Sequence, residues 1–107
     1  MGAGRTLTTW GKRGKFSYQG DAERGVRVLF GRGKSFVVPP AAFVDLLALY
    51  RGREVDIGAS RNPPRDSLGA WLRKHVPGSE VPSAYVGPVL VDLGLAQREG
   101  DALRFKP

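Results

Sequence analysis

Three stretches of the chain repeat one spacing of large side chains, and this repeat limits the fold more than any other feature of the sequence. The side chains fall at positions i, i+3, i+4 and i+7, the spacing that places residues on one face of an α-helix. The three sets are Phe43, Leu46, Leu47 and Tyr50; Leu68, Trp71, Leu72 and His75; and Val86, Val89, Leu90 and Leu93. The spacing predicts three helices, each with one buried stripe.

Prolines and capping residues stand near the starts of these stretches. Pro39-Pro40 can begin the first helix, Asp66 or Ser67 can cap the second, and Ser83 can cap the third. Pro88 falls just past the first turn of the third stretch, where its ring crowds the carbonyl four residues earlier. We therefore expect the third helix to bend at this proline or to begin later.

Short runs of alternating apolar and polar side chains predict β-strands on both sides of the helices. Residues 15–38 contain three such runs, and the sequence GRGK at 31–34 joins the last two as a hairpin. Val55 and Ile57 alternate with acidic residues between the first two helices, and two more short runs flank Glu99-Gly100-Asp101 after the third helix. The sequence therefore predicts an α+β fold.

The length and composition suit a single domain. A chain of 107 residues that is 41% hydrophobic can fold around its own core without disulfides or metal. We expect residues 1–14 to form a flexible basic arm and residues 15–107 to form one domain. Within this domain, residues 15–38 are the N-terminal antiparallel β-meander and residues 40–107 are the helical core.

From residue 40 onward the expected order is helix, strand, helix, helix, strand, strand. The most specific part of this pattern is Ser83, Val89, Leu90, Leu93, Gly94, Leu95, Arg98 and the stretch from Gly100 to Phe105. The order and this stretch resemble the winged helix-turn-helix superfamily, with its third helix, its closing Gly-Leu and its β-wing. The resemblance implies a winged-helix core of three helices plus a β-wing over residues 40–107, and a third helix that enters the major groove of DNA.

The third helix lacks the side chains that read bases. Direct readout in the major groove uses Arg, Lys, Asn or Gln side chains on the base edges. With the apolar stripe turned inward, the outward positions are Ala84, Tyr85, Pro88, Val91 and Asp92. Ser83 and Tyr85 can bond a phosphate, whereas Asp92 would repel the DNA backbone. We therefore expect phosphate contacts rather than base-specific readout through this helix.

The formal net charge is +7, and most of it lies in the first 40 residues. Residues 1–40 hold eight basic and two acidic side chains, a net charge of +6, whereas residues 41–107 hold nine basic and eight acidic side chains, a net charge of +1. A field this uneven attracts polyanions. We therefore predict that the partner is nucleic acid, with double-stranded DNA favoured over RNA.

The predicted phosphate contacts come from several parts of the chain. The set comprises Lys12, Arg13, Lys15, Arg32 and Lys34 in the N-terminal segment, Arg61 and Arg65 in the loop before the second helix, Ser83 and Tyr85 on the third helix, and Arg98 and Arg104 on the wing. Cations at such places neutralise phosphates without reading the sequence.

Two other kinds of binding stay open. A protein-interaction module, acting as an inhibitor or adaptor on an acidic partner or on a second copy in a homodimer, would use Tyr85, Pro88 and Val91 of the third helix. RNA binding on the meander requires Phe16 and Tyr18 to be exposed, so that bases can stack on them. If both rings are buried, the RNA hypothesis fails.

Other classes of function are excluded or disfavoured. The chain has no cysteine, which rules out disulfides, thiolate catalysis and cysteine-ligated zinc, and a reducing compartment such as the cytoplasm is expected. His75, the only histidine, is expected to be half-buried, and no enzymatic activity, metal or cofactor is predicted. The sequence GRGKS at 31–35 lacks a phosphate-binding loop's first glycine, since Val28 stands there. No apolar run reaches the roughly 18 residues of a membrane span, so no membrane contact is expected.

Overall fold

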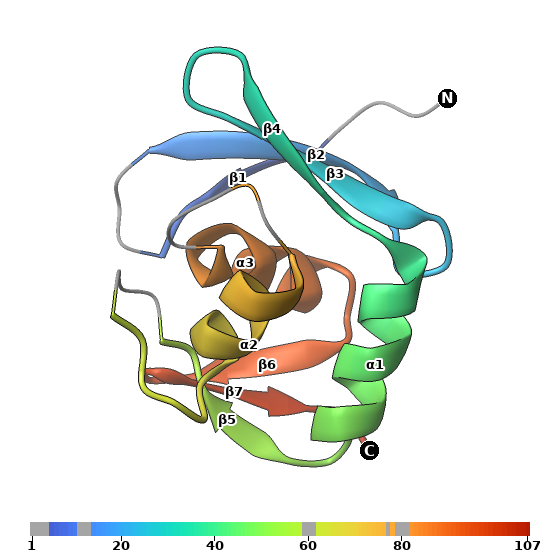
Figure 1. Ribbon diagram of the computed structural model, residues 1–107, viewed down its shortest axis with the longest axis vertical. Coiled ribbons are helices and arrows are strands. Elements are labelled where there is room, and N and C mark those ends of the chain that lie inside the picture. The colour runs from blue at the N-terminus through green and yellow to red at the C-terminus, as the bar shows by residue number, and fades with distance from the viewer. Residues whose placement is uncertain (1–4, 11–13, 59–61, 77, 79–81) are drawn as a thin grey trace.

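The computed structural model describes residues 5–10, 14–58, 62–76, 78 and 82–107. These residues form an α+β fold with three helices and two antiparallel sheets, as the sequence predicts (Figure 1). The elements are β1 (Arg5–Thr8), β2 (Lys15–Asp21), β3 (Gly25–Phe30), β4 (Lys34–Val38), α1 (Pro40–Tyr50), β5 (Glu54–Asp56), α2 (Leu68–His75), α3 (Ser83–Asp92), β6 (Ala96–Glu99) and β7 (Ala102–Phe105). The strand order is β1-β2-β3-β4 in one sheet and β5-β7-β6 in the other.

The first four strands form a meander, called here the N-terminal sheet, in which each strand pairs with the next. Successive side chains on a strand point to opposite faces of the sheet. The buried face carries Phe16, Tyr18, Val26, Val28, Phe36 and Val38. This alternation explains why the three predicted runs over residues 15–38 become strands.

The prediction of a flexible arm is wrong for Arg5–Thr8, which form β1. This strand pairs with β2, from Arg5 opposite Tyr18 to Thr8 opposite Lys15. The pairing satisfies backbone groups along the edge of β2, and Leu7 packs against the core. The other residues predicted for the arm include 1–4 and 11–13, which lie outside the described residues.

The helix ends agree in part with the predicted caps. Pro40 stands in the first turn of α1, and Ser67 Oγ caps α2 by accepting a hydrogen bond from the Ala70 amide at 3.1 Å. α3 begins at Ser83 and contains Pro88, so the proline does not delay its start. The prediction that Ser83 caps this helix is wrong, because its N-cap position is Pro82 and no side chain caps it.

The three-stranded sheet buries one face through Val55, Leu103, Ala96 and Phe105. Val55 pairs with Leu103 and Ala96 with Phe105. The Phe105 ring stacks on Tyr50 at the end of α1, with the two ring centroids 5.4 Å apart. This contact joins the sheet to the first helix.

α2 approaches the chain after β5 so closely that only glycine fits at the contact. The Gly69 amide donates to the Ile57 carbonyl at 2.9 Å. A Cβ atom on Gly69 would lie 2.1 Å from the Gly58 carbonyl oxygen, well inside any real contact distance. Position 69 requires a glycine because the backbone of α2 packs directly against the backbone of residues 57–58.

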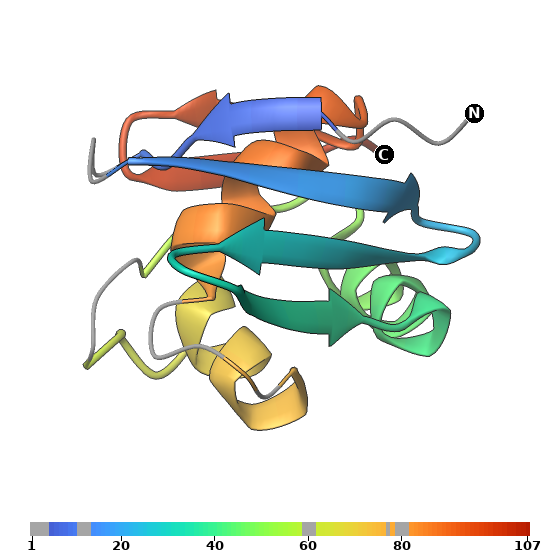
Figure 2. The same ribbon diagram turned by 90° about the horizontal axis from the view of Figure 1, so that it is seen from above.

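α3 lies between the two sheets (Figures 1 and 2). The N-terminal sheet covers one side of α3, and the three-stranded sheet lies on the other side; α1 runs along one flank of the molecule. All three helices and both sheets contribute side chains to one hydrophobic core. In the part of the chain described here, no helix has the length and apolar character needed to cross a membrane.

Candidate nucleic-acid interface

The N-terminal sheet covers part of the face of α3 that the sequence predicts to point outward, while Val91 on this face is 37% exposed. The Tyr85 ring lies 5.2 Å from Phe16, 4.7 Å from Phe30 and 6.0 Å from Phe36, measured between centroids. Pro88 is buried on the same side. The predicted outward orientation is therefore wrong for Tyr85 and Pro88, because the inner face of the sheet packs there. Of the three residues named by the protein-interaction hypothesis, Pro88 is buried, Tyr85 is half-buried and Val91 is exposed.

Asp92, at the end of α3, is engaged by the N-terminal sheet. The Tyr18 hydroxyl donates to Asp92 Oδ2 at 2.5 Å, and Arg5 Nε forms an ion pair with the same oxygen at 2.7 Å. Burial first and this hydrogen bond second raise the pKa of Tyr18 to about 12. Asp92 therefore fixes the sheet to the helix, and it does not face a DNA backbone as the sequence predicts.

Ser83 is also unable to bond a phosphate in this fold. Its side chain is fully buried, and its hydroxyl donates to the Gly58 carbonyl at 3.2 Å. The hydroxyl therefore joins the start of α3 to the segment after β5. The predicted role of Ser83 as a phosphate ligand is therefore wrong, whereas Tyr85 is half-buried with its ring against the N-terminal sheet.

The β6–β7 hairpin, which corresponds to the predicted wing, carries Arg104 on its outer face among acidic residues of β5 and β6. Arg104 Nε pairs with Glu99 Oε2 at 2.9 Å, and Arg104 Nη2 pairs with Glu54 Oε1 at 3.4 Å. Asp56 is exposed on the neighbouring strand. Such exposed pairs contribute little stability, but they balance the arginine with two carboxylates. Arg104 is therefore a poor phosphate contact.

Arg98, the second predicted wing residue, turns toward the N-terminal sheet. It pairs with Leu103 in the hairpin register, so its side chain leaves from the inner side of the hairpin. Its guanidinium carbon lies 4.6 Å from the centre of the Trp10 ring, and its Nε donates to the Gly100 carbonyl at 3.0 Å. The Trp10 ring in turn occupies the space beside Gly87 of α3. Arg98 thus connects the β6–β7 hairpin to Trp10 in the segment after β1, and its guanidinium is already engaged there.

Three exposed cations gather at one end of the N-terminal sheet, called here the basic end: Lys15, Arg32 and Lys34. Lys34 pairs with Phe30, and Ser17 pairs with Leu29, so Lys15 lies beside the β3–β4 turn that carries Arg32. Strands are spaced by about 4.8 Å, which puts β2 about 10 Å from β4. Within the described residues, none of the three cations forms an ion pair.

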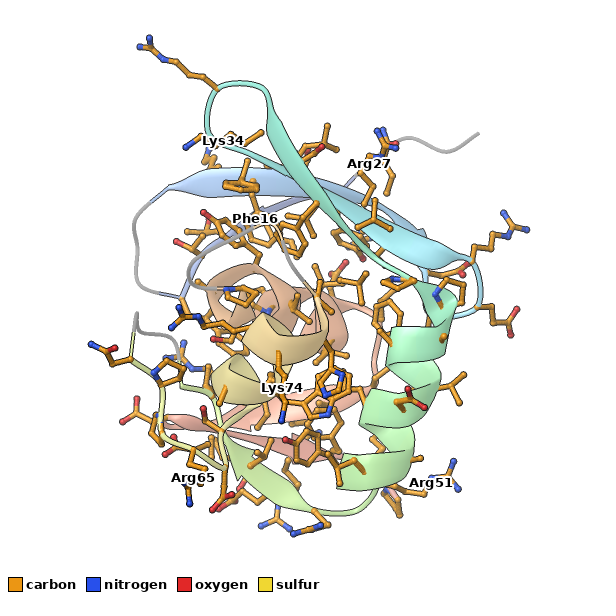
Figure 3. The ribbon with its side chains drawn as sticks, in the orientation of Figure 1. Phe16, Arg27, Lys34, Arg51, Arg65 and Lys74 are labelled. Carbon is orange, nitrogen blue, oxygen red and sulfur yellow. The ribbon has the colours of Figure 1, made fainter. Side chains whose placement is uncertain are left out.

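The remaining predicted cations do not join the basic end. Arg65 is exposed, but it lies at the opposite end of the molecule from Lys34 (Figure 3). Lys12, Arg13 and Arg61 lie outside the described residues. The eleven predicted contacts therefore do not form one surface. Lys15, Arg32 and Lys34 lie at the same end of the N-terminal sheet, with Lys15 on its outer face and Lys34 on the side of Phe36, and Arg65 and Arg104 lie elsewhere.

The outer face of the N-terminal sheet supplies a further cation that sequence reasoning missed. Arg27 points away from the core, on the side opposite Phe16 (Figure 3). The signal for it is present in the alternation of GVRVLF, because Val26 and Val28 are buried and the residue between them must face the other way. Figure 2 shows this face of the sheet with no helix over it.

No protein-family model, curated protein or solved structure matches this chain. The surface of the chain itself is therefore the basis for a functional proposal.

The N-terminal sheet exposes neither Phe16 nor Tyr18 to a ligand. Phe16 and Tyr18 are each only 3% exposed, which overturns the hypothesis that RNA bases stack on these two rings. His75, predicted to be half-buried, is exposed instead, and its ring stacks on Trp71 with centroids 4.3 Å apart. In the described part of the chain, no cluster of three or more potential metal ligands occurs.

Proposed function

We propose that this protein is a non-catalytic nucleic-acid-binding protein that prefers double-stranded DNA and binds it through phosphate contacts at the basic end of the N-terminal sheet. The observation that carries the proposal is the grouping of Lys15, Arg32 and Lys34, which are exposed and form no ion pair within the described residues. Unpaired cations that lie close together can each neutralise a phosphate and release its counterions.

The preference for a duplex follows from the burial of the aromatic rings. Proteins that bind single strands stack bases on exposed aromatic side chains. Here Phe16 and Tyr18 are buried, and Trp10 lies under the Arg98 guanidinium. Phosphate contacts without base contacts give binding that depends little on sequence. The proposed binding is therefore governed by charge and by the shape of the backbone.

We also propose that residues 40–107 form a winged-helix-like unit. The order α1, β5, α2, α3, β6, β7 and the sheet order β5-β7-β6 support this proposal. In this unit the helix that usually enters the major groove would be α3. Because the N-terminal sheet covers α3, the proposed DNA contact lies on that sheet and not on the helix.

Fluorescence anisotropy with a labelled duplex, measured at several salt concentrations, tests the proposed function. Three phosphate contacts should give a slope of about −2.7 in a plot of log affinity against log salt, since each contact adds about −0.9. Lys12 and Arg13 steepen the slope if they also contact phosphate. The variant Lys15→Gln/Arg32→Gln/Lys34→Gln should bind more weakly and show a slope that is flatter by up to the same amount.

A matched control separates the position of the charges from their total. The variant Arg65→Gln/Lys74→Gln/Lys106→Gln also lowers the net charge of +7 by three, at exposed positions away from the basic end. We expect it to keep most of the wild-type affinity and slope. Equal losses in the two variants would contradict the assigned surface, and wild-type binding that ignores salt would contradict phosphate binding altogether.

A further inference from the structure

The serines and threonines of the described residues that are not buried lie on one face of the molecule. Among the described serines and threonines, Thr9, Ser67 and Ser83 are buried. The others are Thr6, Thr8, Ser17 and Ser35, and all four lie on the outer face of the N-terminal sheet. Hydroxyl groups donate hydrogen bonds to phosphate oxygens without adding charge. Their concentration on the sheet that carries the basic end points to one extended surface.

The strand register arranges three of these hydroxyls in a row across the sheet. Thr6 pairs with Ser17, Ser17 with Leu29, and Leu29 with Ser35. Strands spaced by about 4.8 Å make this row about 14 Å long. Only Leu29, which is 36% exposed, interrupts the row with an apolar side chain.

Cations lie on both sides of this row. Lys15 is two residues from Ser17 on the same face of β2, and Arg27 is two residues from Leu29 on the same face of β3. Two residues along a strand correspond to about 7 Å. Within β1 to β4 only Asp21 is acidic; it lies at the end of β2 and accepts a hydrogen bond from the Arg24 amide. The row of hydroxyls is therefore bordered by a cation on each side, and Asp21 lies four residues from Ser17 along β2.

We propose that the outer face of the N-terminal sheet is a phosphate-backbone platform, on which Thr6, Ser17 and Ser35 donate hydrogen bonds to duplex DNA while Lys15 and Arg27 neutralise phosphates on either side. This inference rests on the proposed function and extends its site from the basic end across the whole sheet. A four-stranded sheet is too wide for the grooves, since the major groove, about 12 Å wide, accepts a helix or a two-stranded ribbon. The sheet therefore rests on the backbone.

Neutral hydrogen-bond donors and cations affect the salt dependence of the affinity differently, and this difference provides the test. Losing a hydroxyl removes a hydrogen bond but releases no counterion, so affinity falls while the salt slope stays constant. In the anisotropy assay, Thr6→Val/Ser17→Ala/Ser35→Ala should weaken binding at least about tenfold with an unchanged slope. Lys15→Gln/Arg27→Gln should instead flatten the slope by about 1.8.

Two further variants sharpen the result. Leu29→Thr places a hydroxyl at the gap in the row and keeps a residue that favours strands, so it should tighten binding about threefold to tenfold at the same slope. The control Asn62→Ala/Gln97→Ala removes two exposed neutral polar side chains elsewhere and should bind like the wild type. A Leu29→Thr gain cannot arise from unfolding, so it keeps the test decisive if the triple variant is unstable.

The outcomes separate this inference from the function on which it rests. If the wild type binds with the expected salt slope but the hydroxyl variants bind as tightly as the wild type, the platform is wrong and only the basic end remains as the proposed contact. If the triple variant changes the slope as well, the loss comes from displaced cations and the platform is again wrong. If the wild type does not bind duplex DNA at low salt, the proposed function and the platform fail together.

Discussion

Replacing Tyr18 by phenylalanine tests the contact that holds the N-terminal sheet on α3. The Tyr18 ring is buried, and its hydroxyl donates to Asp92 Oδ2 at 2.5 Å. A hydrogen bond to a charged group contributes about 1.5 to 3 kcal/mol. Asp92 keeps its ion pair with Arg5 in the variant, so the lower end applies. We expect Tyr18→Phe to reduce the free energy of unfolding by about 1.5 kcal/mol near pH 8.

The size of this reduction should depend on pH. Burial and the hydrogen bond to Asp92 raise the pKa of Tyr18 from 10.0 to about 12. Because the folded-state pKa is above the unfolded one, this stabilisation is complete below pH 10 and is lost as the pH rises through 12. The wild type should therefore lose about 1.4 kcal/mol by about pH 11, an amount that Tyr18→Phe cannot lose.

Urea unfolding of both proteins between about pH 8 and pH 11 measures this difference. All other ionisable groups are the same in both proteins, so their effects cancel in the comparison. The difference in the free energy of unfolding should shrink from about 1.5 kcal/mol to nearly zero over this range. A difference that stays constant would refute the inferred link between the buried hydroxyl and Asp92, and so would a variant as stable as the wild type near neutral pH.

Two further substitutions test close contacts that hold the halves of the molecule together. Gly69→Ala places a Cβ atom 2.1 Å from the Gly58 carbonyl oxygen and should cost about 2 to 3 kcal/mol in thermal unfolding. In the control Gly100→Ala, the added Cβ meets nothing within 4 Å, so this variant should lose only about 1 to 2 kcal/mol from its left-handed backbone. If Gly69→Ala is as stable as the wild type, the close approach of α2 to Gly58 is contradicted. Arg98→Ala removes the guanidinium from the Trp10 ring and should lower the free energy of unfolding by about 0.5 to 1 kcal/mol. Arg98→Lys keeps a cation and should lower it by less. If both variants lose the same stability, the cation–π contact is excluded.

The helices and most strands are predictable from sequence because their side-chain spacing records which face meets a core. Leu46, Leu72 and Leu90 are each fully buried at positions that the helical spacing marks. β1 is not predictable in the same way. It carries a single apolar side chain, Leu7, between polar neighbours, and it is fixed by pairing with β2 instead of by its own composition.

The covered face of α3 shows a second limit of sequence reasoning. Periodicity gives the angle between side chains around a helix, but it does not tell which other element lies against each side. The third stretch, SAYVGPVLVD, does contain the relevant signal, since Asp92 is its only charged residue. A helix that is apolar all round is typically buried on all sides. This reading explains why the expected solvent-facing side of α3 meets the aromatic rings of the N-terminal sheet.

The burial of α3 also determines how the molecule would meet a polyanion. The two sheets lie on opposite sides of this helix (Figure 1). Their outer faces differ in charge. The N-terminal sheet presents Lys15 and Arg27, whereas the three-stranded sheet presents Glu54 and Glu99 around Arg104. An electrostatic field attracts a polyanion to the first face and repels it from the second during approach. In the proposed complex, the packing of α3 between the two sheets would therefore turn the N-terminal sheet toward DNA, because the core separates the cations from the carboxylates.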